Sequence, residues 1–256
     1  MMTQKEILQT ALAQSAIDLN CRPEDLTSGK KVVVESKPHP KARAYLKLPF
    51  SCNLVSYGGG VVASVSPEVR KIVTAYIEKY PVEHLFETPN LHALDDALVP
   101  YGLRSCFMAE YFLPDLNALK PLPCPYDLRL LVPADFKNLY LPQWSNALSD
   151  KRPHLDVLGV GAYDGDTLIG FAGCSADCDS MWQIGIDVLP DYRRQGIASA
   201  LTARLALECL ERGKVPFYCA AWSNLPSVRN AIKAGFRPAW VELTAKSIET
   251  VNGMNQ

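Results

Sequence analysis

The stretch 182–212 constrains the fold of this chain more than any other part of the sequence. Ile184, Ile186 and Val188 alternate with other residues, a pattern typical of a strand with one buried face. After Gly196 the spacing of the apolar residues changes from two to about 3.6, which indicates an α-helix. A strand, a short loop and a helix therefore follow one another, and the sequence predicts a mixed fold of helices and strands.

The helix predicted after this glycine has an apolar face and a charged face. Apolar residues recur at helical spacing up to Cys209, while Arg204, Glu208 and Arg212 are placed for charge pairs four residues apart. Gly213 is expected to end the helix.

The loop between strand and helix is suited to an anion. It has the sequence Arg193-Arg194-Gln195-Gly196-Ile197-Ala198. The first N–H groups of a helix have no partner inside the helix, so they can bind a phosphate. Gly196 allows the backbone to approach such a group closely, and Ala198 keeps the packing small.

Composition excludes several other classes of protein. A formal net charge of −1 gives no electrostatic case for nucleic acid or an anionic membrane. Since an apolar run of about 20 residues is absent, no membrane-spanning helix is expected. The polar first residues are unlike a signal peptide, so a cytoplasmic protein is expected. The 8 cysteines include no CxxC pair; reduced, mostly buried thiols and no metal site are predicted.

A proline-rich run divides the chain. Three prolines fall within Lys120–Pro125, a density that breaks helices and central strands. The sequence therefore predicts a linker here, between an N-terminal domain over 1–120 and a C-terminal domain over 126–247.

Each half shows its own order of elements. In the C-terminal half we expect a helix from Pro133 to about Leu148 and a hairpin turn at Asp164-Gly165. In the N-terminal half, Gly58-Gly59-Gly60 is interpreted as a hairpin turn or a β-bulge and not as a phosphate loop, because a strand and not a helix follows it. The remaining predicted strands are 126–132, 158–163, 167–176, 182–189, 215–221, 236–244, 32–35, 84–87 and 104–112, and the remaining predicted helices are 226–234, 6–19, 67–79 and 91–99.

Two motifs in the C-terminal half resemble those of the GNAT superfamily of CoA-dependent N-acetyltransferases. Arg193-x-x-Gly196-x-Ala198 is similar to its pyrophosphate signature. Ala221-Trp222-Ser223-Asn224, with Ser227 and Gly235-Phe236 further on, is similar to its second motif. The resemblance covers about 126–247 and implies an α/β (α+β) fold with a mixed sheet that is splayed at its centre.

The resemblance also implies a cofactor, acetyl-CoA, which serves as co-substrate. It would lie where the strands Gln183–Leu189 and Val215–Ala221 splay apart. The residues implied to bind it are Asp187, Val188 and Leu189 through the pantetheine arm, Arg193, Arg194, Gln195, Gly196, Ile197 and Ala198 through the pyrophosphate, and Asn224 and Ser227.

The sequence offers several candidates for proton transfer. Asp177 and Asp179, in the loop before the strand 182–189, are either candidates for the base or solvated turn residues. Asp187 ends the strand that faces the reaction centre, so it is either a general base, directly or through water, or an anchor for the loop or a neighbouring strand. Many family members carry a tyrosine four residues before the glycine of Gly-Phe, where this chain has Ala231. Solvent or Tyr218 would then protonate the leaving thiolate, unless Tyr218 is only a core aromatic residue.

The N-terminal half resembles an eroded copy of the same pattern. Ala63–Arg70 aligns with Ile186–Arg193, and Tyr101–Arg104 aligns with Ala234–Arg237. Because no glycine follows Arg70, the phosphate loop is missing there. We interpret this half as a smaller, degenerate GNAT-like α/β domain, with chance similarity as the alternative.

The function that the resemblance implies is acetyl transfer from acetyl-CoA to an amine. The order of domains is similar to bacterial acetyltransferases grouped with zwittermicin-resistance proteins, which favours a small-molecule amine as acceptor. The alternatives are a CoA-binding pseudoenzyme with a regulatory role and an interaction module that binds no nucleotide. The sequence leaves the acceptor and the oligomeric state open.

Overall fold

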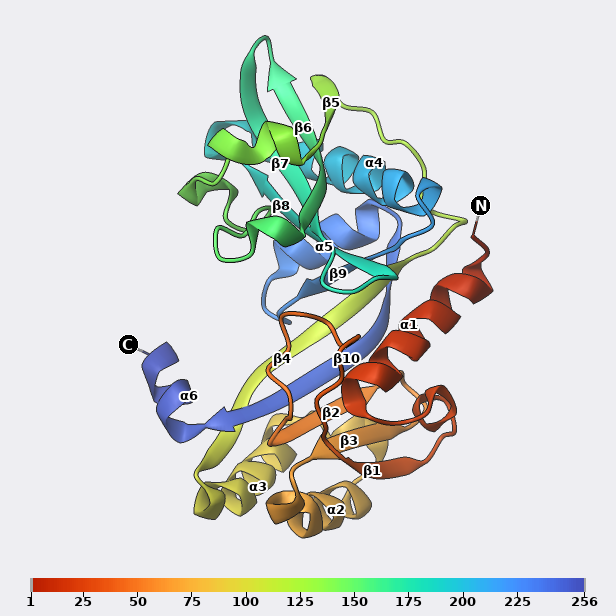
Figure 1. The fold of residues 1–256 in the computed structure, drawn as a ribbon, viewed down its shortest axis with the longest axis vertical. Coiled ribbons are helices and arrows are strands. Elements are labelled where there is room, and N and C mark those ends of the chain that lie inside the picture. Colours follow the sequence, from red (N-terminus) through yellow and green to blue (C-terminus); the bar gives the residue numbers. More distant parts are fainter. Residues whose placement is uncertain (1, 256) are drawn as a thin grey trace. The chain divides into compact units, whose positions relative to one another are not determined.

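The computed structural model describes residues 2–255 and has an α+β fold (Figure 1). These residues form two compact units, each of which contains helices and strands. The first unit combines the described residues up to Ala11 with Phe112–Pro238. The second unit combines Leu12–Tyr111 with the residues from Ala239 onward.

Three elements contain residues of both units. They are α1 (Gln4–Leu19), β4 (Leu103–Pro114) and β10 (Phe236–Ser247). The proline-rich run 120–125 belongs to the first unit and contains neither helix nor strand. The domain ranges 1–120 and 126–247 stay a prediction.

Four antiparallel strands and one parallel strand form the sheet of the first unit. β5 (Asp127–Leu131), β6 (Asp156–Asp164), β7 (Thr167–Ser175) and β8 (Met181–Val188) pair in chain order, with the predicted hairpin turn between β6 and β7. β9 (Val215–Ala220) is parallel to β8. The helix α4 (Ile197–Glu211) packs on β6, β7, β8 and β9, and α5 (Leu225–Lys233) packs on α4 and β9.

The helix predicted behind the loop is confirmed as α4. Leu201, Leu205 and Cys209 are fully buried on its apolar face. On its charged face, Glu208 pairs with Arg204 at 2.6 Å and with Arg212 at 2.7 Å. Both predicted faces of the helix, the apolar one and the charged one, are therefore confirmed.

The helix predicted from Pro133 to Leu148 was wrong. The segment forms two short 3₁₀ helices, η5 (Pro133–Asn138) and η6 (Pro142–Trp144). Pro142 is the reason, since proline lacks an N–H and forces the residue before it away from helical geometry. Leu141 accordingly has extended torsion angles, with φ −121° and ψ 154°.

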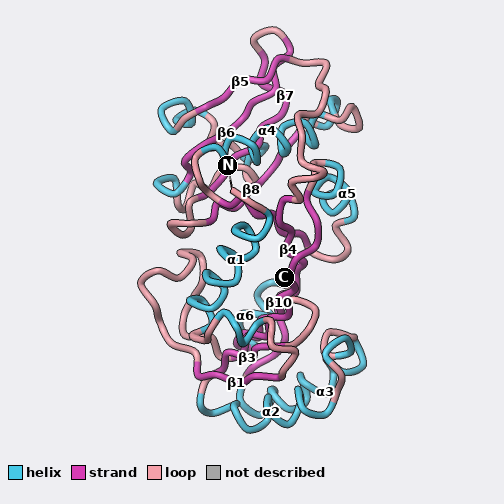
Figure 2. The backbone as a smooth tube through the Cα atoms, turned by 90° about the vertical axis from the view of Figure 1, so that its right-hand side faces the viewer, coloured by secondary structure: helices cyan, strands magenta, loops and turns pink. Residues whose placement is uncertain are grey.

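The second unit has a smaller strand core. β1 (Lys31–Glu35) is parallel to β3 (Val61–Val65), and β2 (Cys52–Ser56) is antiparallel to β3 and to β10. The predicted turn at Gly58-Gly59-Gly60 joins β2 to β3. The helices α2 (Arg70–Lys79) and α3 (Thr88–Leu98) lie on one side of these strands (Figures 1 and 2), and α6 (Ile248–Met254) ends the described chain.

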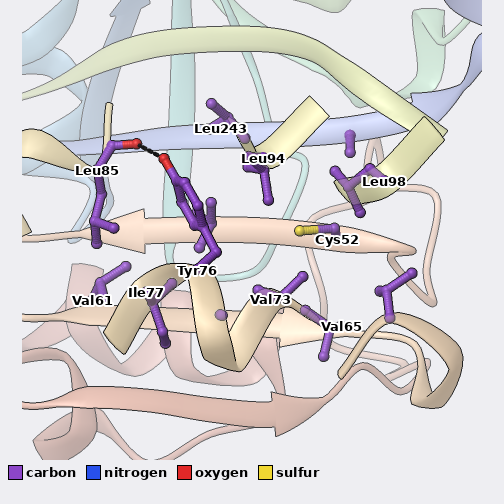
Figure 3. Close-up of a cluster of buried hydrophobic side chains, with 14 of the residues drawn as sticks. Cys52, Val61, Val65, Val73, Tyr76, Ile77, Leu85, Leu94, Leu98 and Leu243 are labelled. Atoms are coloured by element: carbon purple, nitrogen blue, oxygen red, sulfur yellow. Dashed lines mark hydrogen bonds between the residues drawn. The ribbon is translucent and has the colours of Figure 1, made fainter. Parts of the chain in front are cut away.

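A cluster of apolar side chains fills the space between these strands and helices (Figure 3). Val61 and Val65 of β3 contact Val73 and Ile77 of α2 within this cluster. The hydroxyl of Tyr76 donates a hydrogen bond of 2.6 Å to the carbonyl oxygen of Leu85, so its polar end is also satisfied.

The strand predicted over 84–87 was wrong. The 3₁₀ helix η3 (Val82–His84) begins the segment, and Leu85 and Phe86 are both buried although they are adjacent. A strand would have turned these two side chains to opposite faces. The segment is therefore a compact turn that closes the core.

The strands of both units follow in one order, β1-β3-β2-β10-β4-β9-β8-β7-β6-β5, which makes a mixed sheet of ten strands. Two stretches repeat a local pattern of strand, 3₁₀ turn and helix. In one, η2 (Pro67–Val69) leads directly into α2, whereas four residues, 193–196, separate η8 (Pro190–Tyr192) from α4. The additional four residues belong to the predicted phosphate loop, Arg193–Ala198, and the N-terminal stretch lacks an equivalent.

A buried ion cluster crosses the core of the second unit. Arg43 contacts Asp18 at 2.5 Å and Glu242 at 3.3 Å, and each of the three side chains is at least 93% buried (2%, 3% and 7% exposed). Trp240 donates a hydrogen bond of 2.8 Å to Glu242, and its ring stacks on Tyr111 at 4.8 Å between centroids. One cation thus lies between two carboxylates, one from α1 and one from β10.

We predict that Arg43→Met destabilises the protein by about 3–5 kcal/mol, because it leaves two buried carboxylates without a cation. Urea denaturation followed by circular dichroism measures this change. Arg22→Met, which breaks an ion pair in which Arg22 is exposed, is the matched control and should leave the midpoint unchanged. Equal midpoints for the two variants would contradict the prediction.

Candidate active site

The parallel strands β8 and β9 separate after a short pairing. Their registered pairs are Met181 with Val215, Trp182 with Pro216 and Gln183 with Phe217. Both strands continue beyond these pairs, β8 to Val188 and β9 to Ala220. A gap between their ends results, as the resemblance had implied for this pair of strands.

A cavity of about 700 Å³ lies at this gap and extends to the loop before α4. β8 and β9 line one part of it, with Ile186, Asp187 and Tyr218. Residues of the loop, α4 and α5 line the remainder. The cavity therefore joins the separated strands to the N-terminus of a helix.

The loop reaches the helix through two left-handed residues. Arg194 has φ 65° and Gly196, the residue before α4, has φ 85°. No side chain caps the helix at Gly196, and the first turn bond runs from the N–H of Ala200 to the carbonyl of Gly196 at 3.1 Å. The N–H groups of Ile197, Ala198 and Ser199 therefore have no acceptor within the helix, and the helix dipole adds positive potential.

Side chains of the loop fix its shape. The Nε of Arg193 donates a hydrogen bond of 3.0 Å to the carbonyl of Val188. Gln195 accepts one of 3.0 Å from the hydroxyl of Tyr126, so its side chain is directed at the scaffold. The loop is thus braced before any ligand arrives, which lowers the entropic cost of binding.

Four cations surround this end of the cavity. Arg193 and Arg194 come from the loop, and Arg229 and Lys233 come from α5. The Nζ atom of Lys233 lies 3.9 Å from the position that a Cβ atom on Gly196 would occupy. Within residues 2–255, no carboxylate forms an ion pair with any of the four. The electrostatic field here favours an anion with several charges.

Arg229 and Lys233 were not predicted from the sequence as site residues. Their spacing of four residues on a predicted helix places them on one face, and that pattern was available. Their direction toward the loop depends on how α5 packs on α4, which the spacing does not reveal. Ser199 of α4 and Asn230 of α5 make that contact with a hydrogen bond of 3.1 Å.

Asp187 is the only acidic residue among those that line the cavity. Its carboxylate accepts hydrogen bonds from the N–H of Asn146 at 2.9 Å, from the Nδ2 of Asn146 at 2.6 Å and from the N–H of Ala147 at 3.1 Å. The negative side chain thus lies on β8, apart from the cations contributed by the loop and α5.

Tyr218 presents a protonated hydroxyl beside the gap. Burial raises the pKa of the phenol above its ordinary value of 10, although hydrogen bonds with Ser227 and Asn230 act in the opposite direction. The distance between the Tyr218 hydroxyl and the Ser227 Oγ is 2.7 Å. Near neutral pH the phenol is therefore a proton donor. Ala231 is fully buried and absent from the cavity lining.

The structure brings most of the predicted site residues together. Asn224 both lines the cavity and caps α5, since its side chain accepts a hydrogen bond from the N–H of Ser227 at 3.3 Å. Two predicted residues, Leu189 and Gln195, are not part of the lining. The N–H of Leu189 is already bonded to the carbonyl of Ile169 at 2.9 Å. The predicted residues that do line the cavity are Asp187, Val188, Arg193, Arg194, Gly196, Ile197, Ala198, Tyr218, Asn224 and Ser227.

Residues 2–255 contain neither a metal-ligand cluster nor a membrane-spanning helix. Within that range, no three His, Cys, Asp or Glu side chains are grouped so as to hold a metal ion. Among the described helices, none has both the length and the apolar character needed to cross a membrane.

Residues 116–239 match the model of the family described as GNAT acetyltransferase. The match contains the loop, both left-handed residues and all the residues that line the cavity. The matched segment is thus similar to the GNAT acetyltransferases over just under half of the chain. No curated protein is significantly similar in sequence to the chain.

Several solved structures are similar to the chain. A GNAT-family acetyltransferase from Novosphingobium aromaticivorans is 19% identical over 56% of this chain and 66% of its own, with a TM-score of 0.42. A GCN5-related N-acetyltransferase-like protein from Streptococcus suis is 24% identical over 61% and 67%, with a TM-score of 0.46. A GNAT-family acetyltransferase from Colwellia psychrerythraea is 13% identical over 96% and 98%, with a TM-score of 0.47.

The chain thus spans about two thirds of the length of the first two structures, at 66% and 67%. All three TM-scores lie below 0.5, at 0.42, 0.46 and 0.47. The likeness to the GNAT acetyltransferases therefore rests on the sequence match over 116–239, and the fold is defined by the chain's own strand order.

We predict that Lys233→Glu weakens the binding of CoA by about tenfold or more, which is roughly 1.4 kcal/mol, because it replaces attraction to phosphate with repulsion. Calorimetric titration at low and high salt measures the effect, which should shrink as salt rises. Lys137→Glu makes the same change at an exposed position outside the cavity lining and is the control. Equal affinities for the two variants would contradict a role of Lys233 in binding.

Proposed function

We propose that the chain is an acetyl-CoA-dependent N-acetyltransferase whose acceptor is the amine of a small molecule. One observation carries the proposal: a single cavity joins the anion site before α4 to the gap between β8 and β9. The family match over 116–239 supports the same class of reaction. The resemblance to bacterial zwittermicin-resistance-like acetyltransferases favours a small molecule over a protein as acceptor.

The cavity suits the shape and charge of CoA. The pyrophosphate would bind the N–H groups of Ile197 and Ala198, with Arg194 and Lys233 as its counter-charges. The pantetheine arm is a chain with two amide groups, and the unpaired edges of separated strands offer N–H and C=O groups to such a chain. The thioester would then lie near Tyr218, at the gap.

The reaction forms one bond and breaks another. The nitrogen lone pair of the amine attacks the thioester carbonyl, the C–N bond forms and the C–S bond breaks. An amine that enters as an ammonium ion loses protons to water during the reaction. The leaving thiolate takes one proton from Tyr218, so that CoA leaves as a thiol, and Tyr218 regains a proton from water, which leaves one proton released overall.

A CoA-binding pseudoenzyme with a sensing role is the second candidate. Ala231, which stands where many family members carry a tyrosine, is buried and cannot donate a proton. Turnover separates the two candidates. Release of CoA thiol with some member of a broad amine panel supports the enzyme, and tight binding of acetyl-CoA without release across the panel supports the sensor.

We predict that Gly196→Glu abolishes the micromolar binding of acetyl-CoA that the native protein should show. The new carboxylate would lie beside Lys233 and occupy the place of the pyrophosphate. Calorimetric titration measures binding. No binding by the native protein would refute the proposed cofactor.

Gly213→Glu is the matched control for this substitution. Gly213 follows the same helix, has φ 69° and has open space around it, so the backbone strain of the substitution is similar. Its acetyl-CoA affinity should equal that of the native protein. If Gly196→Glu binds as well as Gly213→Glu does, the loop is not the cofactor site.

We also predict that Tyr218→Phe lowers kcat by about 100-fold and leaves the Kd of acetyl-CoA unchanged, because only the proton donor is removed. Steady-state assays of thiol release measure kcat. Ser227→Ala keeps the phenol and removes its hydrogen-bond partner, so its kcat should fall much less. An unchanged kcat in Tyr218→Phe would show that solvent protonates the thiolate.

A further inference from the structure

Asp187 holds a segment that is distant in sequence. Three of the roughly four lone-pair sites of a carboxylate are occupied by donors of Asn146 and Ala147. These donors belong to residues 144–148, which we call the 144–148 loop. The carboxylate therefore ties this loop to β8.

Two glycines let the loop lie directly on the sheet. Gly173 of β7 and Gly185 of β8 are register partners. Two neighbouring positions of the sheet therefore carry no side chain. A methyl group on Gly185 would overlap the carbonyl oxygen of Asn146, and one on Gly173 would overlap that of Ala147. Only glycine permits this approach of two backbones.

Apolar contacts fix the remainder of the loop. Trp144, Ala147 and Leu148 are buried in a cluster with Phe171, and the rings of Trp144 and Phe171 meet edge to face at 6.5 Å. Phe171 projects from β7 on the same face as Gly173, two residues further on. Three kinds of contact thus hold the 144–148 loop. They are backbone packing on the two glycines, packing of apolar side chains, and hydrogen bonds to Asp187.

The loop leaves one side chain at the cavity. Asn146 is exposed and lines the cavity together with Asp187, whereas its neighbours Ala147 and Leu148 are buried. Its Nδ2 is held by Asp187, so the orientation of its amide is fixed. Residues of the phosphate end belong to other elements, namely the loop before α4 and α5.

We propose that Asp187 is a positioning residue. Together with Gly173 and Gly185 it fixes the position of Asn146, whose side chain forms part of the binding site for the acceptor amine. The proposal rests on the proposed function, because it assigns the acceptor end of the same cavity. It gives Asp187 the anchoring role, one of the two roles that the sequence left open. Removal of the Asp187 carboxylate therefore frees the 144–148 loop and weakens binding of the acceptor amine. The residues that bind the phosphates are not changed.

Hydrogen exchange tests the anchor without any substrate. In Asp187→Ala, the amide of Asn146 should exchange at least about tenfold faster than in the native protein, because it loses its acceptor. The amide of Ala147 should change less, because it keeps the carbonyl oxygen of Trp144 as a second acceptor at 3.1 Å. Asp191→Ala removes an exposed carboxylate outside the cavity lining and should leave both amides unchanged. Unchanged exchange in Asp187→Ala would overturn the proposal even if acetyl-CoA binds.

Kinetics test the acceptor site. Asp187→Ala, Gly185→Ala and Asn146→Ala should each raise the KM of the amine by about tenfold or more, and the Kd of acetyl-CoA should stay within about twofold in all three. The pH dependence of kcat/KM should keep its native shape in Asp187→Ala. Asn146→Ala changes an exposed side chain and should not prevent folding. It therefore tests the proposed acceptor site even if Gly185→Ala does not fold.

A general-base role gives the opposite pattern. Asp187→Asn would then remove the acidic limb of the pH profile and lower kcat about 100-fold, while Asn146→Ala would leave the amine KM unchanged; this outcome overturns the proposal. Failure of the proposed function is a separate result, since the native protein would then not bind acetyl-CoA at all.

Discussion

The early end of the hydrogen-bond ladder between β8 and β9 determines how the rest of the first unit can be used. After the pair Gln183–Phe217 the two strands diverge, and a cavity of about 700 Å³ lies at the gap. Backbone groups at such a gap need partners. β8 retains β7 on its other side through Val188, so it remains a rigid strand although it has lost β9. A stiff, open strand edge beside a helix N-terminus is what suits the cavity to the long anionic ligand that we propose for it.

The sequence allowed the prediction of those parts of the site that depend on neighbours along the chain. The alternation up to Val188, the loop with Gly196 and the helical spacing after it each reflect local geometry, and all three occur in the structure. The gap between the strands was implied by resemblance and not by spacing. Pro142 is also a local signal, because proline breaks a helix. It indicates that the helix predicted from Pro133 to Leu148 cannot continue through this residue.

The parts that could not be predicted depend on contacts across the fold. Asp187 and Asn146 are 41 residues apart, and the sequence gives no sign that one would hold the other. Gly173 and Gly185 look like ordinary strand glycines until the loop that lies on them is known. Lys233 has helical spacing with Arg229, but its position beside Gly196 follows from the packing of α5 on α4. Long-range packing therefore carried most of the information that the sequence analysis lacked.

The sharing of α1, β4 and β10 between the two units has a consequence for synthesis on the ribosome. The first unit needs residues from both Gln4–Ala11 and Phe112–Pro238, and the second unit needs the chain from Ala239 onward, where Glu242 meets Arg43. Neither unit has all of its strands until β10 (Phe236–Ser247) has been synthesised. Contacts between residues so far apart in sequence also slow folding. Some strand edges of the nascent protein therefore stay unpaired until late in its synthesis, and unpaired edges favour aggregation.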